Sequence, residues 1–109
     1  MKKEYTIAEL EKLTGFSRRT IHFYIKEGLI PPPGSVGAGA KYGEEHLLRL
    51  KMTALLQKND MKLTGIRKML DSTPLTEMRR SVEEEEARTA IQGLAGLFEG
   101  GYLLRSESL

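Results

Sequence analysis

The sequence predicts a small, mainly α-helical protein, and three features of the chain support this fold class. Apolar residues recur at helical spacing in four successive segments, over about residues 6–13, 17–27, 43–59 and 63–70. Glycine and proline residues separate these segments. A strand signal is present only weakly, in the glycine-rich stretch between the second and third segments. With 109 residues, the chain is expected to form one small domain and one additional element.

The first predicted helix begins at Thr6. Thr6 and Glu9 form a capping-box pattern, in which the hydroxyl of Thr6 caps the helix and the side chain of Glu9 reaches back to it. Gly15 is expected to break the helix. The apolar residues in between recur at helical spacing: Ile7, Leu10 and Leu13.

The second predicted helix is apolar on one side and positively charged on the other. Ser17 is a favourable N-cap, and Gly28 lies where a left-handed residue would end the helix. Ile21 and Ile25, four residues apart, are expected to face inward beside Tyr24. The opposite side carries Arg18, His22 and Lys26 at successive intervals of four residues, with Arg19 beside them.

Two helices joined by a tight turn at Gly15 match a helix-turn-helix, whose second helix enters the major groove of DNA. The residues that point toward base edges would be Ser17, Arg18 and Arg19. The planar guanidinium of arginine can pair with O6 and N7 of guanine or with phosphate. The alternative is a charged face that is only solvated, and the local pattern does not decide between the two.

The glycine-rich stretch of residues 34–40 follows the second helix, and local sequence favours a plain linker there over two short β segments. The third helix begins at Gly43, with Glu44 and Glu45 in its first turn, where acidic side chains suit the helix dipole. Its predicted buried stripe is Leu47, Leu50, Ala54 and Leu55. The fourth helix has Thr64 as a candidate cap, and its apolar residues are Leu63, Ile66, Met69 and Leu70.

The chain changes character at Ser72, where Thr73 and Pro74 mark a boundary. Residues 1–70 hold 13 Lys and Arg against seven Asp and Glu, a net charge of +6, whereas residues 71–109 hold four against eight, a net charge of −4. A basic front joined to an acidic back indicates a polyanion-binding domain followed by a segment with another role. The alternative is chance asymmetry in a small chain, and charge alone does not decide between the two.

The segment after Pro74 carries two apolar stripes. The first comprises Leu75, Met78 and Val82, and the second comprises Ala87, Ala90, Ile91, Leu94, Leu97 and Phe98. At about 100° per residue, the two stripes are offset by about 120°. The segment is therefore either two short helices or one helix with a stutter.

The sequence does not support a catalytic or metal-binding protein. The absence of cysteine excludes disulfides, thiolate metal sites and a cysteine nucleophile. His22 and His46 are isolated and are not expected to bind a metal, and His46 is interpreted as a first-turn helix residue. The acidic run of residues 83–86 is interpreted as a solvated face, because no nucleophile or histidine accompanies it, so we predict neither an enzyme nor a cofactor. No signal peptide or membrane-spanning run is found.

Two stretches of the chain resemble the MerR family of transcriptional regulators: "YTIAELEKLTGFSRRTIHFYIKEGLIPPP" and "KYGEEHLLRLKMTALLQKNDMKLTGIRKML". They contain, in order, the family's T-I-x-E-L helix, T-G-[VF]-S turn, recognition helix, G-L-[IL]-P-P motif and Y-x-E-E helix. The resemblance covers about two thirds of the chain, from Tyr5 to Leu70. It implies a winged helix-turn-helix, in which the glycine-rich stretch forms a small β wing that grips the DNA backbone.

The resemblance also implies which residues contact DNA. Combined with the positive face of the second helix, it predicts the DNA-binding residues Ser17, Arg18, Arg19, Thr20, His22, Tyr24, Lys26, Lys41 and Tyr42. Thr20 and Tyr24 would contact phosphates. The chain departs from the family at His22 and Ala40, where arginine is common, and at Ile25, where an acidic residue is common.

Members of the family dimerise through a long C-terminal helix. We therefore expect a DNA-binding domain over residues 1–72 and a helical segment over residues 73–109, with a homodimer contact within residues 75–98. The alternative for this segment is a helix that folds back on its own domain.

The predicted function is sequence-specific regulation of transcription by a dimer that binds an inverted-repeat promoter site in double-stranded DNA. RNA polymerase is an expected further partner, and the expected location is the cytoplasm, in association with the nucleoid. One alternative is a phage-type excisionase or another architectural DNA-binding accessory protein, because such small proteins share the winged fold. Another is a protein-interaction module whose basic face binds an acidic partner.

Overall fold

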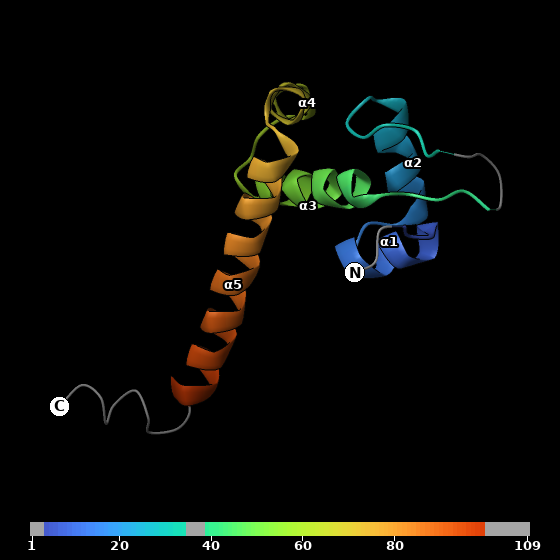
Figure 1. The fold of residues 1–109 in the computed structure, drawn as a ribbon. Coiled ribbons are helices and arrows are strands. Elements are labelled where there is room, and N and C mark those ends of the chain that lie inside the picture. Colours follow the sequence, from blue (N-terminus) through green and yellow to red (C-terminus); the bar gives the residue numbers. More distant parts are fainter. Residues whose placement is uncertain (1–3, 35–38, 100–109) are drawn as a thin grey trace.

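The computed structural model describes residues 4–34 and 39–99, and these form five helices. The helices are α1 (Ile7–Thr14), α2 (Arg18–Lys26), α3 (Glu44–Lys58), α4 (Leu63–Ser72) and α5 (Leu75–Glu99). Helix α3 lies at the centre of the cluster, between α1 and α2 on one side and α5 on the other (Figure 1). None of the described helices is long and apolar enough to cross a membrane.

The predicted caps fix the first two helices. In α1, the backbone N–H of Thr6 donates to Oε1 of Glu9 at 2.8 Å, and the N–H of Glu9 donates to Oγ1 of Thr6 at 3.1 Å, so the capping box is confirmed. Gly15 then takes a left-handed φ of 81° that ends the helix. In α2, Oγ of Ser17 accepts from the N–H of Thr20 at 3.1 Å. The end of α1 and the start of α2 are therefore defined by contacts between residues that are close in the sequence.

The core is built around α3, which is buried on more than one side. Of its predicted stripe, Leu50 is fully buried, while Leu47, Ala54 and Leu55 are only half-buried. The structure buries four further residues of α3 that the predicted stripe did not include: His46, Leu48, Met52 and Thr53. The prediction of a single buried stripe was wrong. Helix α3 contacts both α1 and α5, and it therefore has no fully solvated side.

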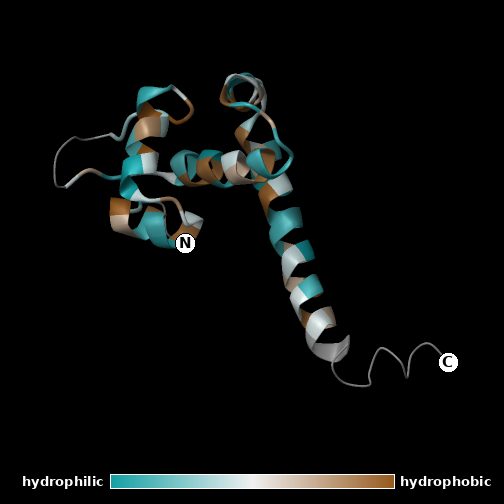
Figure 2. Cartoon of the chain, turned by 180° about the vertical axis from the view of Figure 1, so that it is seen from behind, coloured by the Kyte–Doolittle hydropathy of each residue, from teal (hydrophilic) through white to brown (hydrophobic). Residues whose placement is uncertain are grey.

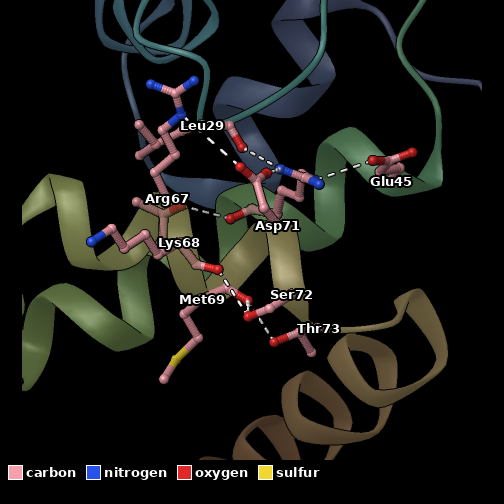
Figure 3. A network of polar contacts seen from close by, with 10 residues as sticks. Leu29, Glu45, Arg67, Lys68, Met69, Asp71, Ser72 and Thr73 are labelled. Atoms are coloured by element: carbon pink, nitrogen blue, oxygen red, sulfur yellow. Dashed lines mark hydrogen bonds and ion pairs between the residues drawn. The ribbon is translucent and has the colours of Figure 1, made fainter.

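Helix α4 differs from its prediction at both ends. Lys62 occupies the N-cap position and no side chain caps it, so the predicted cap at Thr64 is wrong. Met69 is exposed, although Ile66 and Leu70 are fully buried as expected. At the other end, the hydroxyls of Ser72 and Thr73 donate to backbone carbonyls of the last turn (Figure 3).

Helix α5 is a single continuous helix, which decides between the two alternatives for the C-terminal segment. Met78 and Val82 of the first stripe are buried in the core against α3. In the second stripe, by contrast, Ile91 is 64% and Leu94 is 53% exposed. The side chains of Leu97 and Phe98 lie outside the described residues. The two stripes are offset because only the first faces the protein's own core, and the rest of α5 extends away from the other helices (Figure 2).

Ion pairs fix the first half of α5 on α3. Arg79 donates to both carboxylate oxygens of Glu44, at 3.0 and 2.7 Å. About two turns further along both helices, Lys51 of α3 pairs with Glu86 of α5. The Glu44 carboxylate raises the pKa of Arg79 through this hydrogen bond and through its charge. The start of α5 is thereby held to the core by polar as well as apolar contacts.

The base of the expected wing is tied to the N-terminal segment. The N–H of Tyr5 donates to the carbonyl of Tyr42 at 2.7 Å, and the N–H of Tyr42 donates to the carbonyl of Tyr5 at 2.8 Å. This antiparallel bridge is isolated, and no strand is formed in the described part of the chain. The expected tip of the wing, residues 35–38, lies outside the described residues.

Candidate nucleic-acid interface

The first turn of α2 is anchored to α1 by Glu11. Oε2 of Glu11 accepts from the backbone N–H of Arg18 at 2.8 Å, and Oε1 lies 3.5 Å from Nη2 of the same residue. The hydroxyl of Ser17 also donates to Oγ1 of Thr20 at 3.0 Å. These contacts fix the turn between the helices and leave more than half of the Arg18 side chain exposed.

The outward side of α2 is cationic, as predicted. Ile21 and Tyr24 are buried, Ile25 is half-buried, and the residues that face solvent include Arg18, Arg19, His22 and Lys26. Arg19, Lys26 and the exposed Lys41 form no ion pair within residues 4–34 and 39–99. Their charges are therefore available to an anionic partner.

A groove joins this cationic side of α2 to the base of the wing. It is lined by residues from three segments, namely the start of α1, the exposed side of α2, and the chain just before α3: Thr6, Ile7, Ala8, Arg18, His22, Ala40 and Tyr42. The structure thus brings Arg18, His22 and Tyr42 together from positions far apart in the sequence. Lys26, at the other end of α2, does not line this groove.

Tyr42, which lines this groove, is a buried residue. Burial raises the pKa of its phenol above the ordinary value of 10.0, and the positive charge of Arg18 partly opposes this shift. Its ring meets that of His46 edge-on, with centroids 5.2 Å apart. The phenol is therefore neutral near pH 7, and its ring supports the wing base from inside.

His46 has the structural role that the sequence predicted, in the first turn of α3. Its Nδ1 accepts from the backbone N–H of Gly43 at 2.8 Å, and its Nε2 lies 3.2 Å from the carbonyl oxygen of Pro32. A ring that carries its proton on Nε2 satisfies both contacts. The histidine thus connects the chain before the glycine-rich stretch to the chain after it. No cluster of three or more metal-ligating side chains occurs in the described part of the protein.

Tyr24, predicted to contact phosphate, is only 5% exposed. Its hydroxyl accepts from Nε2 of Gln57 at 2.9 Å, and its ring meets that of Phe16 edge-on at 5.3 Å. The structure therefore gives Tyr24 a packing role between α2 and α3. Its contact with phosphate stays a prediction.

Sequence analysis missed Arg49, the centre of a polar network whose partners Leu29, Glu45 and Asp71 are labelled in Figure 3. Its guanidinium bonds to the carbonyl oxygen of Leu29 at 2.9 Å, to Asp71 of α4 at 3.2 Å and to Glu45 of α3 at 3.1 Å. The network ties the chain that leaves α2 to α3 and α4. Only the pairing with Glu45, four residues away, carries a signal in the sequence.

Sequence analysis also missed Phe23, which is 45% exposed on α2. The available signal was its position four residues after Arg19, because residues at this spacing share one side of a helix.

Comparison with known proteins identifies the family. Residues 5–73 match the family described as "MerR HTH family regulatory protein". The chain belongs to this family. The resemblance on which the sequence analysis relied is thereby confirmed, and so is the mainly helical helix-turn-helix fold.

Three relatives extend this comparison. The HTH-type transcriptional regulator ZntR homolog of Haemophilus influenzae is 38% identical over 66 residues, which are 60% of this chain and 49% of that protein. The lead(II) complex of the transcription regulator PbrR691 from Ralstonia metallidurans CH34 is 31% identical, with a TM-score of 0.56 over 92% of this chain and 84% of that chain. HiNmlR, a MerR family regulator lacking the sensor domain, is 26% identical in its complex with promoter DNA, with a TM-score of 0.55 over 94% of this chain and 82% of that one.

The chain spans about half the length of the curated relative from H. influenzae. Family membership favours the regulator over the excisionase and over an enzyme.

Proposed function

We propose that the protein regulates transcription by binding an inverted-repeat promoter site as a homodimer. The observation that carries this proposal is the groove that places Arg18 and His22 of α2 beside Tyr42 at the wing base. A helix with a cationic outward side, next to a second element that can grip the backbone, suits the major groove of DNA and its flanking phosphates. The relative HiNmlR binds promoter DNA and shares this fold, which supports the same role here.

Within this proposal, the contacts divide into those that read bases and those that position the helix. Ser17, Arg18 and Arg19 reach base edges from the first turn of α2, with His22 one turn later on the same side. Thr20, Lys26 and Lys41 would contact sugar and phosphate. Tyr24 and Tyr42 would reach phosphate only through their hydroxyl groups, because both residues are buried. Because phosphate contacts release condensed counterions, affinity falls as salt rises, and each lysine lost reduces the salt slope by about 1.

The proposed dimer contact uses the exposed stripe on the second half of α5. Ala87, Ala90, Ile91 and Leu94 are all exposed, and the helix that carries them extends away from its own core. A second copy would bury this stripe and present two α2 helices to two half-sites. In this arrangement residues 1–72 bind DNA and residues 73–109 serve the dimer. The site would be a promoter occupied by RNA polymerase, on the nucleoid in the cytoplasm.

Selection of bound duplexes from a random pool tests the proposal, with the wild type, Arg19→Ala and Arg80→Ala examined in parallel. Arg80 is a matched control, because it is an exposed arginine on α5, away from the proposed interface. The wild type and Arg80→Ala are expected to enrich the same inverted repeat, which Arg19→Ala fails to enrich. A wild-type pool without an inverted repeat would refute the proposal. Binding to an acidic protein but to no duplex would favour the interaction module.

A further inference from the structure

Phe23 is one of five large apolar side chains that are exposed in the described part of the protein. Single exposed apolar residues are common and carry no meaning by themselves. Phe23 differs from the other four because it lies on α2, among the cationic residues of the proposed DNA-binding side. Arg19 precedes it by four residues, Lys26 follows it by three, and Glu27, the one acidic residue on this side, follows it by four.

Helical geometry places Phe23 and Arg19 on the same side of α2. Residues four apart in a helix differ by about 40° in direction. Arg19 is exposed, whereas Ile21 and Tyr24 point into the core. A partner that meets the guanidinium of Arg19 therefore also meets the ring of Phe23.

The ring of Phe23 is supported from behind by a row of aromatic side chains. Its centroid lies 5.9 Å from that of Tyr24, at an interplanar angle of 50°. Tyr24 is in turn held by Phe16 and by the hydrogen bond from Gln57. Phe23 therefore presents an apolar surface that packs on a buried neighbour, which suits a contact at a defined position.

We propose that Phe23 recognises thymine in each half-site through the C5-methyl group. This inference rests on the proposed function and adds a specificity-determining residue to it. A phenyl ring neither donates nor accepts a hydrogen bond, so it cannot pair with phosphate or with the polar edges of bases. The methyl group of thymine is the apolar feature that the major groove presents, and phenylalanine is among the side chains that contact it.

The charges beside Phe23 favour DNA over a second copy of this face. The face around Phe23 is net positive, with Arg19 and Lys26 against the single carboxylate of Glu27. Two copies would bring this net positive charge against the same charge of the partner, and like charges in contact oppose association. A nucleic acid supplies both the negative charge that these residues need and an apolar group for the ring.

The test replaces thymine by deoxyuridine, which lacks only the methyl group, one position at a time in both halves of the selected site. Affinity is measured by fluorescence anisotropy for the wild type, Phe23→Ala and Met69→Ala. Met69 is the matched control, an exposed apolar residue on α4. Because Phe23 is partly exposed, Phe23→Ala should keep the fold, which circular dichroism checks.

At one thymine position, deoxyuridine should weaken wild-type binding about fourfold per half-site, the effect of one buried methyl group. Met69→Ala should show the same loss. Phe23→Ala should bind the thymine site more weakly than the wild type and no more weakly when the methyl group is absent.

Three outcomes would overturn the inference while leaving the proposed function intact. They are a selected half-site without thymine, wild-type binding that ignores every deoxyuridine, and a deoxyuridine effect that persists in Phe23→Ala. If no duplex is enriched at all, the proposed function fails and the role of Phe23 fails with it.

Discussion

The guanidinium of Arg49 donates a hydrogen bond of 2.9 Å to the carbonyl oxygen of Leu29. Leu29 follows Gly28, the residue that ends α2, and both Leu29 and Ile30 are buried in the core. Arg49 also bonds to Asp71 of α4 (Figure 3). The position of the end of α2 is therefore coupled to α3 and α4 through one side chain.

Replacement of Arg49 by alanine should lower the free energy of unfolding by about 1–3 kcal/mol, because it removes hydrogen bonds made by a charged group that is only 15% exposed. Urea denaturation measures the change. Arg67→Ala is the control, since Arg67 is well exposed and lies 4.0 Å from Asp71, so its loss should cost less than about 0.5 kcal/mol. Equal effects of the two substitutions would show that the network adds no stability.

Replacement of Gly28 by alanine should also destabilise the fold. Gly28 has a φ of 83°, and an added Cβ would lie 3.3 Å from the guanidinium of Arg67. The left-handed conformation alone costs a side chain about 1–2 kcal/mol. The control is Gly39→Ala, where open space surrounds the added atom, and it should change stability by less than about 0.5 kcal/mol. A thermal melt of Gly28→Ala that matches the wild type would contradict the assignment of this turn.

The ionisation of Tyr42 should reduce stability at high pH. Burial raises its pKa above 10.0 in the folded protein, so the unfolded chain loses this proton first as the pH rises. The corresponding stability is complete below about pH 10 and is lost as the pH passes through the folded-state pKa. In an ultraviolet titration of the tyrosines, Tyr42→Phe should remove the step at highest pH, and Arg18→Ala should move that step higher. If the titration curve of Tyr42→Phe has the same shape as that of the wild type, the phenol of Tyr42 is not buried.

Replacement of Ile91 by glutamate should produce a folded monomer. Ile91 is exposed in the single chain, so the charge is tolerated there, whereas burial of the same charge in the proposed dimer is unfavourable. Sedimentation velocity measures the mass. Met69→Glu, on the exposed side of α4, should remain a dimer. If Ile91→Glu is still dimeric, the contact lies elsewhere.

Local signals in the sequence predicted the parts of the fold that depend on neighbouring residues. The capping box of Thr6 and Glu9, the cap at Ser17 and the turn at Gly28 are all present as expected. Each depends on contacts within a few residues, which the spacing of residue types already determines. The buried side of α2 was predicted from the four-residue spacing of Ile21 and Ile25.

Contacts between distant segments could not be predicted in this way. Leu13 and Met69 have helical spacing but are exposed, because spacing within one helix does not determine where other helices pack against it. The contacts of Arg49 with Leu29 and Asp71 depend on how α3 and α4 pack together. The two stripes of α5 were detected, but only the structure shows that the first faces its own core.

The most direct test of the central claim is to map the protein surface that DNA covers. Backbone amide shifts of the labelled protein would be followed by nuclear magnetic resonance as the selected duplex is added. The account predicts changes concentrated at residues 17–26 and 39–42. A second exposed basic surface lies on α4 and its start, at Lys62, Arg67 and Lys68. Changes centred there, with α2 unaffected, would contradict the account.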